Sequence, residues 1–363
     1  MSTEVAQPQV LTSVEGALTR ITLNRPRALN ALNHDMVKAV YEAIQGAAQA
    51  GSNAVLLDSS DERGFCGGGD VKAMREGGID YTMAFLHDEY RADYAVHTSR
   101  VPVVAIMHGI TMGGGIGLAG HAAIRVVTET SRLAMPETRI GIVPDVGGHL
   151  PLAKAPGRLG ELLAITSGSM TAGDAIALGF ADFYVPYERL DALRERLVSG
   201  EDPSAAVAAL AEPAPPSELV AAREWFDPIA DAALGEPTET LADAALAAQR
   251  LVEALETSAV AEAQTTAATV REMCPTSVAV TIGEIARVRR EGLGLAEVLV
   301  DDYRLLGRLC ARSDFIEGVR ALLIDRDNNP QWLPASLEQL EPAVVAAILD
   351  PAFADGENAL ELA

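Results

Sequence analysis

Two passages from a strand through glycines into a helix constrain the fold of this chain more than any other feature. Residues 101–107 (VPVVAIM) form an apolar, β-branched run typical of a buried strand, and the glycine-rich residues 113–117 that follow begin a helix. Residues 54–58 (AVLLD) form a second such run, which leads through a polar turn into glycines at residues 67–69. Strands that alternate with helices imply right-handed crossovers and largely parallel sheets with helices outside. The sequence therefore predicts an α/β fold.

The two glycine clusters also indicate where a ligand binds. The start of a helix leaves backbone N–H groups without partners, and glycines let a ligand oxygen approach those donors closely. An oxyanion hole needs two N–H groups that converge on one oxygen, and two separate loops can supply them. The alternative is that these glycines only serve tight turns and close packing of strand against helix.

Two carboxylates follow, and each comes directly after a proline. They are Glu137 in MPE and Asp145 in VPD. Proline fixes φ and disfavours helix just before it, so both acids are expected on stiff turns that hold a side chain in place. Two simpler interpretations stay open: Glu137 is a solvated loop acid, or Asp145 is the N-cap of a helix over residues 150–155.

Composition excludes several classes of protein. The chain has 51 acidic and 28 basic residues and a net charge of -23, which argues against a nucleic-acid or anionic-membrane surface. Cys66, Cys274 and Cys310 lie far apart, without the spacing of a disulfide framework or a metal site. The first ten residues, MSTEVAQPQV, lack the pattern of a signal peptide. We therefore expect an untargeted, soluble, cytoplasmic protein without a bound metal.

The first half of the chain contains several local signals for individual elements. Residues 10–24 alternate as a β-hairpin, and residues 33–49 form an amphipathic helix capped by Asn33. A helix over residues 79–100 and strands at 124–128 and 181–185 complete the alternation. His108 ends an apolar strand and is interpreted as a hydrogen-bonded core residue rather than a base.

The second half is expected to be helical. Helices are predicted over residues 277–290, 295–310 and 314–324, and Ser336 to Gln339 has the form of a capping box for the last helix. The proline-containing residues 212–217 are the best candidate for a linker. We divide the chain into a catalytic core, residues 1–190, and a helical C-terminal region, residues 191–363.

Several strings resemble one superfamily in their order and spacing. ITLNRPRALNAL, FCGGGDV, HGITMGGGIGL and MPETRIGIVPDVGG resemble the crotonase (enoyl-CoA hydratase/isomerase) superfamily. The C-terminal strings CPTS, DYRL and DFIEGVRALLIDRDNNPQWLP resemble its 3-hydroxyisobutyryl-CoA hydrolase branch. The resemblance implies a crotonase-like spiral of ββα units with a helical C-terminal region. It also implies hydrolysis of a short 3-hydroxyacyl-CoA thioester in valine catabolism.

The resemblance assigns the catalytic and substrate-binding residues. The N–H groups of Gly69 and Gly114 would form the oxyanion hole for the thioester carbonyl. Glu137 would be the central catalyst, either as a general base that activates water or as a nucleophile. Asp145 would orient the substrate hydroxyl or relay a proton. Glu89 matches a further position near the substrate, although an acid in an exposed helix is usually only solvated.

The resemblance also indicates where coenzyme A binds. Arg27 and Ala28 match a position near its phosphates, and residues 67–71, including Gly67, Gly69, Asp70 and Val71, would line its adenine end. Coenzyme A is part of the substrate, so no separate cofactor is expected. Superfamily members often trimerise, which makes a homo-oligomer possible.

One departure from the superfamily pattern separates the possible reactions. A hydratase needs two glutamates, and the position of the first is Gly117 here, whereas Asp145 stands where many hydratases have glycine. This favours hydrolysis. The alternatives are an enoyl-CoA hydratase or isomerase, and a noncatalytic acyl-CoA-binding protein. The acyl chain stays open, because one methyl group in an apolar pocket changes specificity by only about 1 to 3 kcal/mol.

Overall fold

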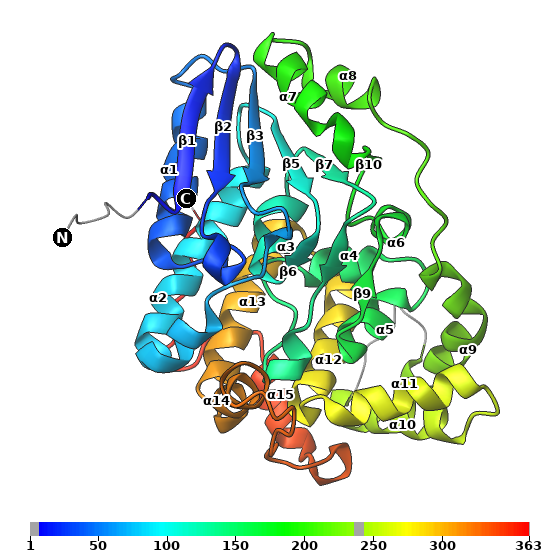
Figure 1. Cartoon of the computed structure of the whole chain (residues 1–363). Helices are drawn as coiled ribbons and strands as arrows, with labels where there is room; N and C mark the ends of the chain where they lie inside the picture. The colour runs from blue at the N-terminus through cyan, green and yellow to red at the C-terminus, as the bar shows by residue number, and fades with distance from the viewer. Residues whose placement is uncertain (1–6, 236–242, 363) are drawn as a thin grey trace.

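A six-stranded sheet forms one end of the molecule (Figure 1). The computed structural model describes residues 7–235 and 243–362. The strand order is β1-β2-β3-β5-β7-β10, in which β1 and β2 are antiparallel and the other neighbouring pairs are parallel. The strands are β1 (Val10–Glu15), β2 (Leu18–Leu23), β3 (Ala54–Ser59), β5 (Val103–Met107), β7 (Ile124–Val127) and β10 (Phe183–Tyr184). The hairpin and the parallel strands predicted from the sequence are confirmed.

A smaller sheet continues from the first and carries the glycine loops. Its order is β4-β6-β8-β9, and only β8 and β9 are antiparallel. The strands are β4 (Gly64–Cys66), β6 (Ile110–Met112), β8 (Arg132–Ala134) and β9 (Ser169–Met170). Along the chain, β3 and β4, β5 and β6, and β7 and β8 each place one strand in each sheet before the chain turns back. This repetition is the expected spiral of ββα units.

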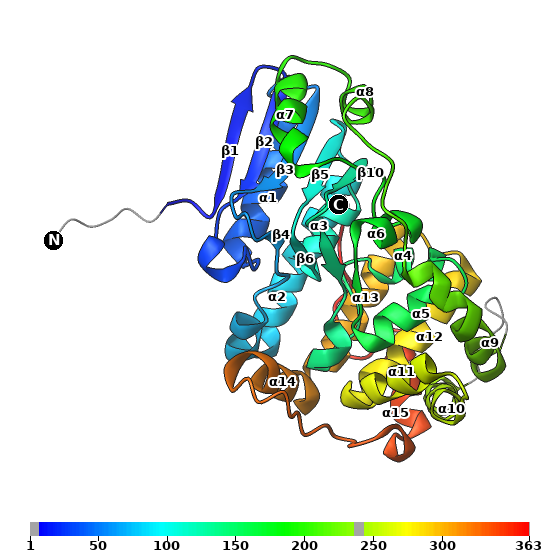
Figure 2. The same ribbon diagram turned by 45° about the vertical axis from the view of Figure 1, so that its right-hand side comes forward.

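Helices cover both faces of the large sheet. α1 (His34–Ala47) and α3 (Gly114–Gly120) pack on the inner face, where α2 (Val71–His97) packs against both of them, and α7 (Leu190–Val198) and α8 (Pro203–Ala208) pack on the outer face. Figures 1 and 2 both show α7 and α8 at the sheet end of the molecule. On the outer face, buried Leu193 and Leu197 share an apolar cluster with Val104 and Val126.

The longest helix begins earlier than the sequence predicted. A first segment that the sequence did not predict starts at Val71 and precedes the helix expected from residue 79; the side chain of Asp70 accepts a hydrogen bond from the N–H of Ala73 and caps it. Gly78, with φ of 72°, breaks the helical geometry between the first turns and the remainder. The helix at residues 34–47 follows the prediction, with Asn33 accepting from the N–H of Met36.

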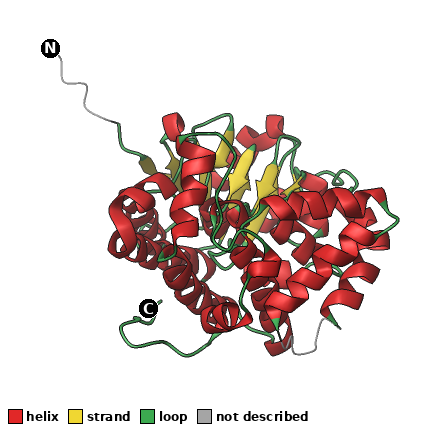
Figure 3. Ribbon diagram, turned by 90° about the horizontal axis from the view of Figure 1, so that it is seen from below, coloured by secondary structure: helices red, strands yellow, loops and turns green. Residues whose placement is uncertain are grey.

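Helices α9 to α12, α14 and α15 lie toward the end opposite α7 and α8 (Figure 2). Seen from below, helices lie beside and in front of the strands (Figure 3). The remaining helices are α4 (His149–Lys154), α5 (Leu159–Thr166), α6 (Ala172–Ala177), α9 (Arg223–Leu234), α10 (Ala244–Thr257), α11 (Ala261–Glu272), α12 (Pro275–Glu291), α13 (Leu295–Cys310), α14 (Ser313–Val319) and α15 (Pro342–Leu349). The π-helical turn η5 (Arg320–Ile324) follows α14 directly.

The capping box expected at Ser336 is wrong. The side chain of Ser336 makes no capping hydrogen bond, and the 3₁₀ turn that it precedes, η6 (Leu337–Gln339), ends before the last helix. That helix begins at Pro342, whose fixed φ and missing N–H suit the first helical position.

One large apolar cluster joins the two parts into which we divided the chain. It contains residues of the inner sheet face together with residues of α10, α12 and α13. α7 and α8 pack on the sheet although they follow residue 190. The division at residue 190 stays a prediction about folding units. None of the helices within the described residues has the length and apolar composition to span a membrane.

Candidate active site

The two glycine loops, the two proline-linked acids and part of the C-terminal region meet at one cavity of about 180 Å³. Its polar lining includes three carboxyl groups and the glycine backbones. The lining residues from the first half of the chain are Gly67, Gly68, Gly69, Val71, Met74, Phe85, Leu86, Glu89, Met112, Gly113, Gly114, Pro136, Glu137, Ile140, Ile142, Asp145 and Val146. The structure therefore brings together five predicted catalytic or substrate-binding residues, Gly69, Glu89, Gly114, Glu137 and Asp145.

Gly69 and Gly114 lie side by side at the starts of two helices. Gly69 follows β4 and precedes α2, and Gly114 is the first residue of α3. Neither N–H donates a hydrogen bond to another residue in the described part of the chain. A Cβ added to Gly114 would overlap Oε1 of Glu89 and lie 3.2 Å from the nitrogen of Gly69. The two donors can therefore reach one oxygen only while residue 114 has no side chain.

Glu137 is buried rather than solvated, which excludes the simpler interpretation of this acid. It begins the 3₁₀ turn η2 (Glu137–Ile140) directly after Pro136, and only 5 % of its surface is exposed. Its Oε2 has no hydrogen-bond partner among the described residues, and its Oε1 lies 2.8 Å from the position of a Cβ on Gly113. Burial, followed by the nearby charge of Asp145, raises the pKa of Glu137 well above its usual range.

Asp145 is held by a tyrosine and does not cap a helix. Helix α4 begins at His149 with Gly148 as its N-cap, so the interpretation of Asp145 as an N-cap is wrong. The side chain instead accepts a hydrogen bond of 2.5 Å from the hydroxyl of Tyr90 on α2. Burial raises the pKa of Asp145 to about 7, against the lowering effect of this hydrogen bond.

A residue from α13 holds the turn that carries Asp145. The backbone N–H of Gly147 donates to Oδ2 of Asp302 at 2.8 Å, and Nδ1 of His149 lies 2.6 Å from Oδ1 of Asp302. Both side chains are fully buried. Val146, inside the turn, has a φ of 53°, an unfavourable conformation for a β-branched residue. Asp302 therefore fixes a strained turn from the opposite half of the chain.

Asp302 and Tyr90 were missed as functional residues by the sequence analysis. Both lay inside strings that it singled out, DYRL for Asp302 and the segment around Glu89 for Tyr90. The family resemblance of these strings indicated that the segments around Tyr90 and Asp302 are related to function. They did not show that these two side chains contact the turn and carboxyl group of Asp145.

The C-terminal region supplies part of the apolar wall. Leu322 and Leu323, both on η5, line the cavity together with Ile140 and Ile142. The long string from Asp314 that resembles the hydrolase branch thus contributes directly to the site. The helical region is part of the cavity as well as of the core.

Most of the loop expected at the adenine end lines the cavity. These residues are Gly67, Gly68, Gly69 and Val71. Asp70 does not line it, because its carboxylate caps α2 and pairs with Arg25 at 2.7 Å. Arg27 is exposed on the 3₁₀ turn η1 (Pro26–Ala28), and Ala28 is half-buried beside it; neither lines this cavity.

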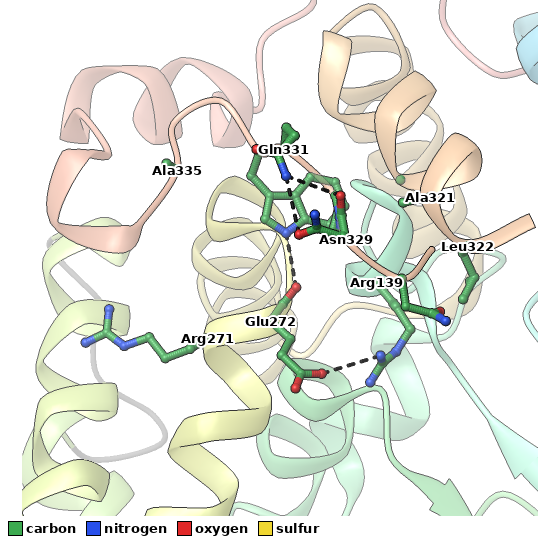
Figure 4. A pocket seen from close by; sticks show the side chains of 12 residues that line it. Arg139, Arg271, Glu272, Ala321, Leu322, Asn329, Gln331 and Ala335 are labelled. Carbon is green, nitrogen blue, oxygen red and sulfur yellow. Dashed lines mark hydrogen bonds and ion pairs between the residues drawn. The ribbon is translucent and has the colours of Figure 1, made fainter. Parts of the chain in front are cut away.

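A second cavity has a volume of about 460 Å³ and shares Leu322 with the lining of the first. Figure 4 shows this second cavity from close by. Its wall includes Arg139, which lies 3.7 Å from the carboxylate of Glu272, and Trp332, whose indole N–H donates to the Glu272 carbonyl. The glycine donors and the acids of the smaller cavity are not part of its lining. We therefore place the candidate active site in the smaller cavity.

The other groups considered in the sequence are structural. His108 is buried, with Nε2 2.9 Å from the carbonyl oxygen of Asp61, as predicted for a core residue. Burial raises the pKa of the Cys66 thiol to about 12, which leaves it unreactive. Within residues 7–235 and 243–362, no group of His, Cys, Asp and Glu has the arrangement of a metal site.

The sequence is similar to those of known proteins. Residues 18–349 match the family described as Enoyl-CoA hydratase/isomerase. The chain is 36% identical over 344 residues to a protein of Danio rerio named 3-hydroxyisobutyryl-CoA hydrolase, mitochondrial, which covers 93% of this chain and 88% of the relative. The Homo sapiens protein of that name is 34% identical over 343 residues, covering 92% and 86%.

Solved structures share the whole fold. A carnitinyl-CoA dehydratase from Mycobacterium thermoresistibile superimposes with a TM-score of 0.87 at 34% identity, covering 98% of this chain and 99% of that one. An enoyl-CoA hydratase from Rhodobacter sphaeroides gives the same score and identity, covering 98% and 100%. The predicted crotonase-like fold and the resemblance are thereby confirmed, and the chain belongs to the enoyl-CoA hydratase/isomerase family.

Proposed function

We propose that the protein hydrolyses a short 3-hydroxyacyl-CoA thioester, namely 3-hydroxyisobutyryl-CoA in valine catabolism, to the free acid and coenzyme A. The observation that carries this proposal is the convergence of two free N–H donors with the buried carboxyl groups of Glu137 and Asp145 on one cavity. The cavity is small and has mostly apolar walls, which suits a short acyl chain. The relatives named 3-hydroxyisobutyryl-CoA hydrolase support the choice of substrate.

The chemistry follows from the positions of these groups. The N–H groups of Gly69 and Gly114 hold the thioester carbonyl and stabilise the negative charge that develops on its oxygen. Glu137 takes a proton from water, which attacks the carbonyl carbon; the C–S bond then breaks and coenzyme A leaves as the thiolate. Asp145 binds the 3-hydroxyl group, with Tyr90 fixing its orientation.

A second route uses the same carboxylate as the nucleophile. Glu137 then forms an anhydride as the thiolate leaves, and water hydrolyses the anhydride. A single turnover in oxygen-18 water detects the anhydride when water attacks its Glu137 carbon, because the label then enters Glu137 and the released acid stays unlabelled. Label in the released acid alone is the result of direct hydrolysis or of attack on the acyl carbon of the anhydride.

Coenzyme A would be held by Arg27 and by the loop of residues 67–71, most of which also lines the small cavity. Arg27 on η1 offers an exposed cation for its phosphates, and residues 67–71 offer backbone groups for its adenine. The protein's net charge of -23 opposes this anionic ligand, so local cations are needed. We also propose that the protein forms a homo-oligomer and is cytoplasmic. The Danio rerio relative, by contrast, is named mitochondrial.

Hydration of an enoyl-CoA is the alternative, and the surroundings of Gly117 argue against it. A Cβ at Gly117 would lie 2.6 Å from Cβ of Val146 and 2.7 Å from Oδ2 of Asp93. No larger side chain fits there without moving α2 or the turn of Asp145. The position from which a hydratase directs its first glutamate is therefore closed.

Two parallel assays test the proposed reaction. Given 3-hydroxyisobutyryl-CoA, the purified protein should release thiol that reacts with a chromogenic thiol reagent. Given crotonyl-CoA, it should cause little loss of the enoyl-thioester absorbance. Rapid hydration of crotonyl-CoA without thiol release from hydroxyacyl thioesters would show that the protein is a hydratase, and binding without either reaction would show that it is noncatalytic.

A further inference from the structure

Glu89 lies against both glycine donors. It is on the face of α2 that packs on α3, and it is 2 % exposed. Its Oε1 lies 3.8 Å from the position of a Cβ on Gly69, and a Cβ on Gly114 would overlap the same oxygen. No hydrogen bond from any described residue reaches Oε1. This carboxyl group is therefore beside the oxygen that the two N–H groups would bind, and it contributes nothing visible to the packing or capping of α2.

A second carboxyl group follows one helical turn later. Asp93 is fully buried, and neither of its oxygens has a hydrogen-bond partner in the described structure. Its Oδ2 fills the space beside Gly117. An ionised carboxylate without a hydrogen-bond donor or cation is strongly disfavoured in such a place. Glu89 and Asp93, which lie beside Gly114 and Gly117, therefore lack hydrogen bonds from the described residues that would stabilise their ionised forms.

The elements around Glu89 provide no compensating positive charge. The described groups that interact electrostatically with Glu89 are acidic or neutral: Cys66 of β4, Tyr90 and Asp93 of α2, Glu137 of η2 and Asp145 before α4. The nearby histidines have other roles. His149 pairs with Asp302, His34 faces Asp88, and burial lowers the pKa of His121 to about 4, which leaves it neutral. Burial, then the charge of Asp145, raises the pKa of Glu89 well above its usual range.

We propose that Glu89 works as a neutral carboxylic acid whose hydroxyl group donates a third hydrogen bond to the substrate oxygen held by Gly69 and Gly114. A neutral O–H adds to the stabilisation of the developing oxyanion, whereas an ionised Glu89 would repel it. Glu89 is then an acid donor and neither a base nor a merely solvated residue. This inference rests on the proposed function and specifies how its oxyanion site is completed.

Three variants test the role of Glu89 in turnover. Glu89→Gln keeps a neutral donor of the same shape, so it should retain activity at neutral pH within a few-fold, and the loss of kcat/KM at high pH caused by ionisation of Glu89 should disappear. Glu89→Leu removes the donor and should lower kcat by about 10² to 10³-fold. Asp80→Asn is the matched control on the same helix, because Asp80 is exposed and forms no ion pair with any described residue. It should leave the pH profile unchanged.

The opposite pattern would overturn the inference. If Glu89→Gln were as slow as Glu89→Leu at every pH, Glu89 would act as an ionised base. If Glu89→Gln kept the same loss of activity at high pH as the wild type, that loss would not come from Glu89. Should Glu89→Leu fail to fold, the pH profile of Glu89→Gln decides the question alone.

Stability provides a readout that does not depend on turnover. Between the usual glutamate pKa and the raised pKa of the folded state, the unfolded chain loses the Glu89 proton and the folded chain keeps it, so folding weakens as pH rises. Glu89→Gln lacks this effect. Its Tm should therefore gain on the wild type by several degrees as the pH rises from 5 to 8, while Asp80→Asn keeps a constant difference. A constant difference for Glu89→Gln would show that Glu89 is ionised, even if the protein hydrolysed no thioester.

Discussion

At the scale of single residues, the hydrogen bond from Tyr90 to Asp145 lowers the pKa of this acid of the site. The Tyr90 hydroxyl donates to Oδ2 of Asp145 at 2.5 Å. Burial disfavours the ionised form of this carboxyl group, and the hydrogen bond favours it. A hydrogen bond to a charged group is worth about 1.5 to 3 kcal/mol, which corresponds to about 1 to 2 pKa units. Tyr90 therefore keeps the pKa of Asp145 near neutrality, at about 7.

Replacing Tyr90 should shift the acid side of the pH–rate profile. In Tyr90→Phe the pKa of Asp145 rises further, so the pH at which activity is half lost on acidification should move up by about 1 to 2 units. Tyr303→Phe is the control, because the Tyr303 ring packs against Tyr90 while its hydroxyl donates to the Met83 carbonyl. An acid limb that stays in place in Tyr90→Phe would mean that Asp145 does not titrate in turnover.

Residue-level predictions from the sequence succeeded where the signal was local. Asn33 was recognised as a cap, because helix starts are encoded within a few residues. The resemblance singled out Gly69 and Gly114 within the two glycine clusters; the structure brings the two residues together, and their role as donors stays a prediction. The burial of Glu89 was not predictable. It depends on which face of α2 packs against α3, and the sequence of that helix has no strong periodicity that would select a face.

At the scale of elements, α13 acts as a support for the catalytic turn. Asp302 on α13 accepts from the N–H of Gly147 and pairs with His149, and these partners lie more than 150 residues away in sequence, at separations of 155 and 153. Such a contact has no local signature. The sequence could predict the helix over residues 295–310 from its amphipathic pattern, but not which loop it would hold.

The support can be weakened without removing any group that contacts the substrate. Asp302→Asn should destabilise the protein by about 1 to 3 kcal/mol and lower kcat by up to about 10²-fold, because the turn of Asp145 loses its anchor. Asp301→Asn is the control: Asp301 is equally close to the core but pairs with Arg304 and Arg287. It should lose stability and keep its rate. Equal rates in the two variants would show that α13 contributes stability alone.

At the scale of the whole molecule, the active site spans both halves of the chain. The ββα spiral supplies the donors and acids, while η5 supplies Leu322 and Leu323 and α13 supplies the anchor. The spiral was predictable from alternating strand and helix patterns together with the family resemblance. The closure of the cavity by the C-terminal region was not, because it depends on how a helical layer docks on the spiral.

The central claim is that Glu137, placed beside the two donors, carries out thioester hydrolysis. Glu137→Gln preserves the shape of this buried side chain but removes its basicity and nucleophilicity. The most direct measurement is thiol release from 3-hydroxyisobutyryl-CoA by this variant, together with its affinity for the same thioester. We predict nearly unchanged binding and the loss of most turnover. A folded Glu137→Gln protein that releases thiol at the wild-type rate would contradict the account.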